Sequence, residues 1–378
     1  MIDEQTTLEQ RSGSKWARLP FRRAVGLYLA IRVATLLSVG VVNLFTHRGV
    51  LRNLSVWDGA WFLKAVHDGW PVHLPVAHGH VLANPIAFFP LLPLIMRALS
   101  ALTGLSPASV GLVVSGLSGL GAVVAVGVVA RTFATDDQAE RAALLFAVSP
   151  GAFVFSLIYA EGLLITLAAL SLWSLLHRKW LLAGVLAALA SAASPVGLAL
   201  VVSCAVAAFD DVRRYHRWRS LGALVLAPLG FVAWMTYLWR HTGNLMAWRL
   251  TEREGWHSYP SLGYPLHIVA TFLANPLAPT MTGQILFAGT VLSLAALVIS
   301  FRERQPAVVW AFSAAVLVLA MISAPVGLRP RFVMLAFPLV IGLATRWSGW
   351  RYWCLVALSG LGLVLMTIES LNSFAVFP

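Results

Sequence analysis

Charged side chains are scarce in this sequence. Only 11% of its 378 residues are Asp, Glu, Lys or Arg, and 59% are hydrophobic, whereas roughly a quarter of the residues in an ordinary globular domain are charged. So few charges cannot cover the surface of a soluble fold this large. The apolar content also excludes a disordered chain, and two cysteines are too few for a disulfide-stapled secreted domain. An integral membrane protein remains, and its many separate apolar blocks make it polytopic.

Other absences narrow the chemistry. We find no closely spaced cluster of metal ligands. The nearest candidate is a loop with His73, His78 and His80, which is more typical of a flexible polar segment than of a zinc site. Cys204 and Cys354 both lie inside apolar blocks, so we expect no disulfide, no metal and no cofactor. The net charge of +12 would suggest a nucleic-acid partner in a soluble protein, but here the basic residues separate apolar blocks and report topology instead.

The distribution of charge predicts the organisation of the chain. Residues 1–24 form a polar, basic tail that we expect in the cytoplasm, and the block 25–46 is predicted to be a retained signal-anchor helix. Residues 25–378 are expected to be one all-α transmembrane domain with about ten to twelve membrane segments and short interfacial helices. The positive-inside rule places the loops 47–83 and 242–282, and the short turn 326–331, together on the extracytoplasmic face.

Two apolar blocks do not fit a simple membrane-spanning helix. The block 180–209 is broken at Ser194 to Gly197 and has basic residues at both ends, so it is interpreted as a re-entrant hairpin. The block 84–104 carries three prolines. It either lies in the outer interface or is a span that violates the charge rule.

Residues 55–62 contain the first candidate for chemistry. If this segment is helical, Trp57 lies over Trp61 and Asp58 over Phe62, which suits a short helix at the membrane surface. An interfacial anchor is one interpretation. The other is a general base, because desolvation beside aromatic rings can raise the pKa of a carboxylate.

Glu161 is the second candidate, because it is an acid between two apolar runs and follows Tyr159 closely. An ionisable group at such a place suggests function. The alternative is that Glu161 stabilises the start of the next helix through the helix dipole.

Several motifs in order resemble one family. They are Trp57-Asp58 followed by Trp61, an aromatic loop ending in Gly69-Trp70, Ala87-Phe88-Phe89-Pro90, then Ser149-Pro150 followed by Phe155-Ser156, Tyr159 and Glu161, and a later Ser194-Pro195-Val196-Gly197 turn. In this order they resemble the PIG-V mannosyltransferases, which are multi-pass enzymes of the GT-C class. The likeness covers about residues 55–200, with a fainter match at Arg331-Phe332 and Phe337-Pro338. Relatives often carry an arginine where this chain has Ser194, which puts a phosphate-binding role there in doubt.

The resemblance implies a function and a set of roles. The protein would transfer mannose, with inversion, from a polyprenyl-phosphate-mannose donor to an extracytoplasmic glycolipid or lipid-linked glycan, at the cell membrane. Asp58 matches the catalytic acid of the first extracytoplasmic loop and would act as general base. Substrate contacts are expected from Trp57, Trp61, Phe62, Asp68, Tyr159, Glu161 and His257. Asp68 is the second-choice base, although a solvated charge is the more typical role for it.

A lipid phosphate leaving group needs cations near the outer headgroup plane. Arg329 and Arg331 lie on a predicted outer turn and break the positive-inside pattern, so we expect them to bind the donor phosphate. Alternatively, they extend to lipid phosphates as ordinary anchors. No glycine-rich loop or large cytoplasmic domain is present for a nucleotide sugar, which favours a lipid-linked donor. The competing hypotheses are transfer of another sugar, such as arabinofuranose or glucose, and a non-enzymatic lipid or solute transporter.

Overall fold

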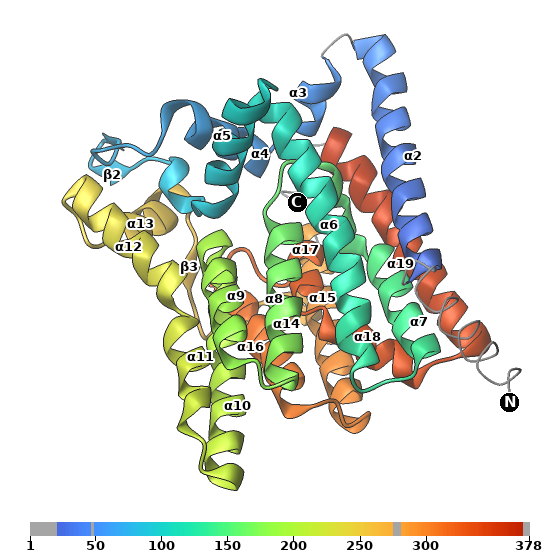
Figure 1. Cartoon of the computed structure of the whole chain (residues 1–378). Helices are drawn as coiled ribbons and strands as arrows, with labels where there is room; N and C mark the ends of the chain where they lie inside the picture. Colours follow the sequence, from blue (N-terminus) through green and yellow to red (C-terminus); the bar gives the residue numbers. More distant parts are fainter. Residues whose placement is uncertain (1–20, 47–48, 275–280, 373–378) are drawn as a thin grey trace, which may run out of the picture.

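The computed structural model describes residues 21–46, 49–274 and 281–372. Most of the expected cytoplasmic tail, residues 1–20, therefore lies outside the described residues. The rest is a bundle of helices, in which α6, α8 and α9 run side by side and the segment from α3 to β2 lies across one end (Figure 1). The fold is all-α apart from two very short strand pairs in the described part.

The first half of the chain alternates short surface elements with long apolar helices. In order, it forms α2 (Arg22–Thr46), α3 (Val50–Leu54), α4 (Asp58–Asp68), β1 (Val76–Ala77), β2 (His80–Val81), η1 (Pro85–Ala87), α5 (Leu91–Thr103), α6 (Pro107–Arg131), α7 (Asp136–Ala147), η2 (Pro150–Ser156), α8 (Glu161–Leu176), α9 (Trp180–Ala193) and η3 (Pro195–Leu198).

The second half begins with the return from the broken helix. It forms α10 (Ala199–Tyr215), η4 (Trp218–Ser220), α11 (Leu221–Leu226), α12 (Leu229–Thr242), α13 (Ala247–Leu250), η5 (Thr251–Gly255), β3 (Tyr259–Pro260), α14 (Tyr264–Ala274), α15 (Met281–Arg302), α16 (Ala307–Ile322), β4 (Ser323–Ala324), α17 (Pro330–Leu335), α18 (Pro338–Arg346) and α19 (Gly349–Asn372).

Six described helices are long and apolar enough to cross a membrane, and a seventh span is formed if the bent pair α7 and η2 counts as one. Five shorter apolar helices lie beside them: α5, α8, α9, α14 and α16. The protein is therefore a multi-pass membrane protein. The predicted count of ten to twelve segments is reached only if the five shorter helices are included. Each of these has fewer than the roughly 20 residues that span a bilayer.

Small residues bring the central helices into close contact, as is usual between helices in membranes. A Cβ atom on Gly162 of α8 would lie 2.8 Å from the backbone nitrogen of Gly119 on α6. The first turn of α8 is thereby fixed against α6. The block predicted as a re-entrant hairpin does break into α9 and α10, joined by the turn η3, whose Gly197 lies against the backbone of Ala190. The part after the break, Pro195–Tyr215, is however long and apolar enough to cross a membrane, so only α9 is short.

The three polar segments predicted to converge do so. Strand β3 pairs with β4 in the antiparallel sense, which joins the 242–282 loop to the turn before α17. The carboxylate of Glu254 accepts a hydrogen bond from the Val81 amide (2.7 Å), which joins the same loop to β2. We call the end of the bundle that carries α3, α4 and these loops the site end.

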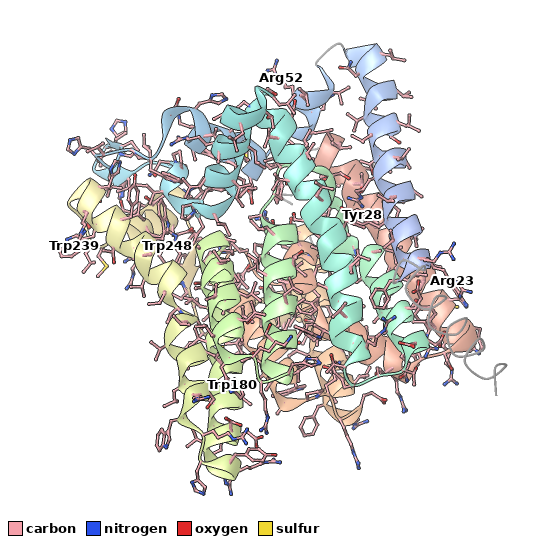
Figure 2. All side chains as sticks on the ribbon, in the orientation of Figure 1. Arg23, Tyr28, Arg52, Trp180, Trp239 and Trp248 are labelled. Atoms are coloured by element: carbon pink, nitrogen blue, oxygen red, sulfur yellow. The ribbon has the colours of Figure 1, made fainter. Side chains whose placement is uncertain are left out.

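The opposite end, which we call the basic end, contains Arg23, Arg131 and Arg141. Arg23 lies in the first turn of α2 and Arg52 lies in α3, beyond the other end of that helix; Figure 2 shows Arg52 at the top of the molecule and Arg23 lower, at its right-hand edge. A helix of 25 residues such as α2 is about 37 Å long at 1.5 Å per residue. The two ends are therefore separated by more than the thickness of a bilayer core.

Candidate active site

Arg331 lies between two acidic residues that the sequence singled out. Its Nη1 is 2.6 Å from Oδ2 of Asp58 and 3.7 Å from Oε1 of Glu161. The three residues come from α17, α4 and α8, which are far apart in sequence. Only 12% to 26% of these side chains is exposed, so the charges interact in a medium that screens them much less than water does.

The start of α4 aims Asp58 at Arg331. Trp57 precedes the helix with a φ of +57°, which is uncommon for a residue other than glycine, and Asp58 is the first helical residue. Gly59 follows, and a Cβ there would lie 3.3 Å from Cβ of Ile158, so α4 begins in direct contact with the segment before Glu161. At the other end of α4, Arg97 donates hydrogen bonds to the carbonyl oxygens of Ala65 and Val66 (3.1 and 2.8 Å).

Helix α17 carries Arg331 in its first turn. Arg329 precedes the helix and Pro330 occupies its first position, where a missing N–H and a fixed φ favour helix initiation. The helix packs closely on η2, because a Cβ on Gly151 would lie 2.5 Å from the Pro330 carbonyl oxygen and 3.0 Å from Cα of Arg331. A glycine at position 151 therefore permits the approach that places Arg331 over the site.

Helix α8 supplies Glu161 at its first position. An acid there is favoured by the helix dipole, so the structural role considered for Glu161 coexists with its ion pair. Tyr159, two residues earlier, is buried, and its ring lies 5.4 Å from the Arg331 guanidinium. The backbone of Tyr159 is held by Ser115, whose hydroxyl accepts from its amide and donates to its carbonyl, both at 3.1 Å.

The electrostatics of the two arginines differ. Burial lowers the pKa of Arg331, but the carboxylate of Asp58, with Tyr159 and Glu161, outweighs this effect and raises the pKa above its ordinary value. Burial lowers the pKa of Arg329, and the positive charge of Arg331 lowers it further, against the opposing influence of Tyr264 and Asp58. The charge of Arg331 is thus stabilised by neighbouring anions. The charge of Arg329 is destabilised by Arg331, and a bound anion would stabilise it.

Two buried polar atoms of the cluster, the Nε–H of Arg331 and the hydroxyl of Tyr159, have no hydrogen-bond partner among the described residues. The Nε–H of Arg331 is buried and makes no hydrogen bond within the described structure. Buried donors are nearly always satisfied. A phosphate oxygen is a fitting acceptor for this group, because guanidinium binds phosphate through charge-assisted, often paired hydrogen bonds.

Other predicted residues lie elsewhere. Trp57 precedes α4, so it does not stack over Trp61, and its indole donates to the Ser370 carbonyl of α19 (3.0 Å). Phe62 is 5% exposed and packs in an apolar cluster with Leu92 and Met96. Phe62 is therefore placed with packing residues, and not beside Arg331.

Asp68 and His257 also lie apart from the cluster. Asp68 ends α4, about 15 Å along the helix from Asp58, and forms an exposed ion pair with Lys64 (2.8 Å). A hydrogen bond from Lys64 and its positive charge lower the pKa of Asp68. His257 is exposed and follows η5. The structure thus brings together Asp58, Tyr159, Glu161 and Arg331, with Arg329 close enough to respond to them.

Glu252 was not selected from the sequence. It lies in η5, is largely buried, and responds to the charge of Asp58, so it belongs to the same site. In the sequence Glu252 is one of several charges in a polar loop. The only available signal was its position in a loop predicted to converge on Asp58.

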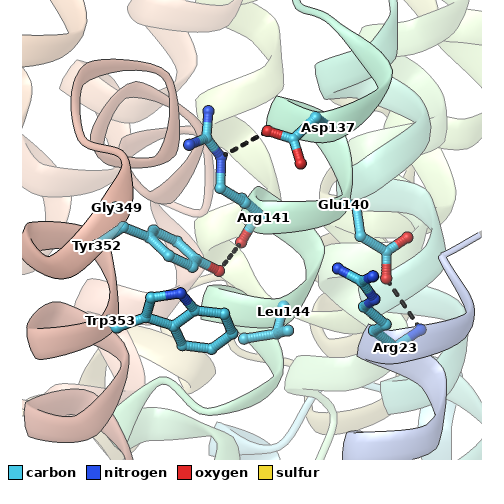
Figure 3. Close-up of a pocket in the computed structure, with 8 residues that line it drawn as sticks. All are labelled: Arg23, Asp137, Glu140, Arg141, Leu144, Gly349, Tyr352 and Trp353. Atoms are coloured by element: carbon cyan, nitrogen blue, oxygen red, sulfur yellow. Dashed lines mark hydrogen bonds and ion pairs between the residues drawn. The ribbon is translucent and has the colours of Figure 1, made fainter.

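A second cluster of mixed charge lies at the basic end, around a cavity of about 250 Å³ lined by Arg23, Asp137, Glu140, Arg141 and Tyr352 among others (Figure 3). Here the charged groups stabilise helix ends and turns. Glu140 accepts from the backbone amides of Arg23 and Ala24 (2.9 and 3.1 Å), at the start of α2. Arg141 pairs with Asp137 (3.4 Å), one helical turn away.

Comparisons with known proteins identify the fold. The chain is similar to the crystal structure of ArnT from Cupriavidus metallidurans in the apo state, with 17% identity, a TM-score of 0.52, and coverage of 83% of this chain and 60% of ArnT. It also resembles ArnT bound to undecaprenyl phosphate (18% identity, TM-score 0.49, 90% and 63% covered). The apo oligosaccharyltransferase of Archaeoglobus fulgidus is more distant (14% identity, TM-score 0.46, 92% and 56% covered).

The chain spans less than two thirds of the length of each of these structures. A comparison with curated protein sequences gave no match.

The fold and the clustered charges define a class: a multi-pass membrane protein with the fold of the GT-C glycosyltransferases. Within that class, a family model described as Mannosyltransferase (PIG-V) matches residues 29–236, more than half of the chain. The protein belongs to the PIG-V mannosyltransferase family.

Proposed function

We propose that this protein transfers mannose from a polyprenyl-phosphate-mannose donor to an extracytoplasmic lipid-linked glycan or glycolipid, with inversion at the anomeric carbon. The observation that carries the proposal is the ion pair between Asp58 and Arg331, with Glu161 beside it. In this ion pair, Asp58 could take the proton of the acceptor hydroxyl, and Arg331 could stabilise the phosphate leaving group. The family match supports mannose as the sugar.

The chemistry is a single displacement. The acceptor hydroxyl oxygen forms a bond to the anomeric carbon while the bond from that carbon to the phosphate oxygen breaks, and its electron pair stays on the phosphate. The hydroxyl proton passes to Asp58 and then to solvent. The products are a new glycoside and polyprenyl phosphate.

Asp58 suits the role of base even though it is paired with Arg331. The guanidinium lies 2.6 Å from Oδ2 of Asp58 and orients the carboxylate, whose other oxygen could take the proton. The proton becomes much more acidic as the acceptor oxygen bonds to carbon, which means that a weak base is sufficient late in the reaction. A bound phosphate would share Arg331 with Asp58, through the Nε–H that is unpartnered in the described structure.

Arg329 and Arg331 would stabilise the charge that develops on the leaving phosphate. Glu161 lies 3.7 Å from the same Nη1 of Arg331 that contacts Asp58, so the two acids would share this cation before the donor binds. The site end carries this cluster, whereas Arg23, Arg131 and Arg141 lie at the other end. By the positive-inside rule, this arrangement supports an extracytoplasmic site.

The proposal is tested with purified protein in lipid vesicles that contain radiolabelled polyprenyl-phosphate-mannose and the membrane lipid extract of cells lacking this protein, in which the acceptor accumulates. Label should move into an acceptor lipid, and polyprenyl phosphate should appear in equal amount. Parallel assays with glucose and arabinofuranose donors decide the sugar. Movement of an intact lipid or solute across the vesicle, without transfer from any donor, would overturn the proposal in favour of a transporter.

A further inference from the structure

Glu252 lies on a short segment that is fixed by three contacts with residues 81–84. Thr251 accepts a hydrogen bond from the buried Asn84 side chain (3.1 Å), and Glu254 accepts one from the Val81 amide (2.7 Å). A Cβ on Gly255 would lie 2.7 Å from the Ala83 nitrogen. The segment forms a π-type turn, a rare conformation that is frequent at functional sites. Glu252 is therefore held by a built framework and not by a free loop.

Glu252 and Glu254 lie two residues apart but differ in their surroundings. The Glu254 carboxylate is used to hold β2. Glu252 has no cationic partner among the residues that the structure describes, and the charge that acts on it is that of Asp58. Burial, assisted by the Asp58 carboxylate, raises the pKa of Glu252 to about 7. Two acids close together in a buried site, one without a counter-ion, form an environment that favours hydroxyl groups over further anions.

An aromatic wall joins α4 to the residue that follows the Glu252 segment. It consists of Trp61, Phe88 and Trp256, all of them half-buried. The rings of Trp61 and Phe88 are stacked with centroids 6.1 Å apart, and Trp256 meets their edges at 5.0 and 5.5 Å. Trp61 lies one turn after Asp58 on α4, and Trp256 follows η5 directly. The wall therefore connects α4, which begins with Asp58, to η5, which carries Glu252.

Asp58 is influenced by groups of opposite charge. Arg331 lies 2.6 Å from it, with Arg329 near, and we call this the arginine side. Asp58 acts on Glu252, whereas Arg331 is not among the groups that act on Glu252. We call the surroundings of this acid the Glu252 side, where its negative charge would repel a lipid phosphate. A base in a displacement reaction has to lie where acceptor and donor meet. The phosphate therefore fits the arginine side, and an uncharged, hydroxyl-rich group fits the Glu252 side.

We propose that Glu252 and the aromatic wall form the acceptor subsite, in which Glu252 hydrogen-bonds a ring hydroxyl and Trp61 and Trp256 pack against the ring. This proposal rests on the proposed glycosyl transfer and specifies its acceptor. Aromatic faces with a few polar groups suit a ligand that has both apolar and polar surface. A ring of the proposed glycolipid or lipid-linked glycan fits this subsite better than a simple lipid alcohol does.

The test uses the purified full-length protein, the radiolabelled donor and the lipid extract of cells lacking the protein as acceptor. Glu252→Ala is expected to raise the apparent KM for the acceptor lipid in the extract by about tenfold or more. The bound acceptor ring would then have a buried hydroxyl group without a hydrogen-bond partner. Trp256→Ala should raise this KM in the same way. The KM for the donor should not change, since the donor phosphate binds at the arginine side.

Glu254→Gln is the matched control, because glutamine retains the oxygen that accepts from Val81. It should leave both KM values unchanged. If Glu252→Ala fails to give a monodisperse, folded protein, Trp256→Ala carries the test, since it removes the aromatic face of the subsite and leaves Glu252 in place.

Periodate treatment of the extract tests the acceptor class. It cleaves vicinal diols, so a ring acceptor should no longer accept sugar, whereas a simple alcohol would remain active and would overturn this part of the proposal. Unchanged acceptor KM in the Glu252 and Trp256 variants, with transfer intact, overturns the subsite and leaves the proposed function standing. Absence of transfer by the unaltered protein from every donor overturns the proposed function itself.

Discussion

The two ends of the bundle both collect acidic and basic side chains, but they use them differently. At the basic end, Glu140 caps the start of α2, and Arg141 pairs with Asp137 one turn away on the same helix. At the site end, Arg331 joins Asp58 and Glu161 from two other segments, in positions largely closed to solvent. Both ends join distant segments, but at the basic end Glu140 bonds backbone amides and the exposed Asp137 bonds a neighbour one turn away, whereas the site-end ion pairs join charged side chains that are largely closed to solvent.

This difference separates structural charge from candidate catalytic charge. Exposed ion pairs contribute little to stability and can be replaced at low cost. Buried charges are expensive to place and are retained where function needs them. Substitutions made in pairs, one at each end, can therefore show whether the site end is a reaction centre or only a more buried version of the basic end.

The largest effect is expected from Asp58→Asn, matched with Asp137→Asn at the basic end. Loss of a general base typically lowers turnover by about 10²–10⁴-fold. Asparagine keeps the size of the side chain, so folding and donor binding should persist. The measurement is the initial rate of label transfer. Equal rates for the two variants would remove Asp58 from the mechanism.

A smaller loss of turnover is expected from Arg331→Gln, with Arg23→Gln as the control. Removing a donor that stabilises transition-state charge lowers turnover by about 10²–10³-fold. The same change leaves Asp58 and Glu161 without their cation, and breaking a buried pair costs about 3–5 kcal/mol. Both the rate and the Tm should fall. A lower Tm with an unchanged rate would make Arg331 purely structural.

Gly151→Ala should lower turnover by less than the two previous variants, because it only moves α17, and with it Arg331, away from η2. Its Cβ would lie 2.5 Å from the Pro330 carbonyl oxygen, and overpacking of this kind costs about 1–3 kcal/mol. We expect a rate about tenfold lower, because small misplacements of catalytic groups are costly. Gly26→Ala on α2 is the control, since nothing lies within 4 Å of a Cβ at that position. Full activity of the Gly151 variant would separate the η2 contact from catalysis.

The smallest effect concerns pH. The pKa of Glu252 is raised from 4.5 to about 7, mainly by burial. The folded protein therefore keeps a proton that the unfolded chain releases, so the stability this group contributes is complete below pH 4.5 and is lost as the pH rises toward 7. The Tm of the unaltered protein should fall relative to that of Glu252→Gln over this window. If the difference in Tm between the unaltered protein and Glu252→Gln did not change with pH, Glu252 would not be buried as the structure has it.

Much of the architecture could be predicted from the sequence. Apolar blocks and basic clusters give a polytopic helical protein, and the charge rule places three polar segments on one face, where the structure joins them. Asp58, Glu161 and Arg331 were selected because acids and arginines are conspicuous in such surroundings. Their ion pairs link segments up to 273 residues apart in sequence, and no local pattern specifies such a contact.

The remaining parts of the site depend on packing. The sequence could not place Trp57 outside the helix, because its indole is held by the Ser370 carbonyl of α19, which is 313 residues away in the chain. It could not distinguish Phe62, which is buried, from Trp61, which stays half-exposed, because both lie on one short helix. Glu252 was indistinguishable from Glu254 until the loop was placed against α4 and β2.

The most direct test is an experimental structure of the protein with polyprenyl-phosphate-mannose bound to the Asp58→Asn variant. Our proposal predicts the phosphate within hydrogen-bond distance of the Arg331 guanidinium, near Arg329, with the anomeric carbon facing residue 58. A phosphate bound at the basic end beside Arg23 and Arg141, or a sugar directed away from residue 58, would contradict it.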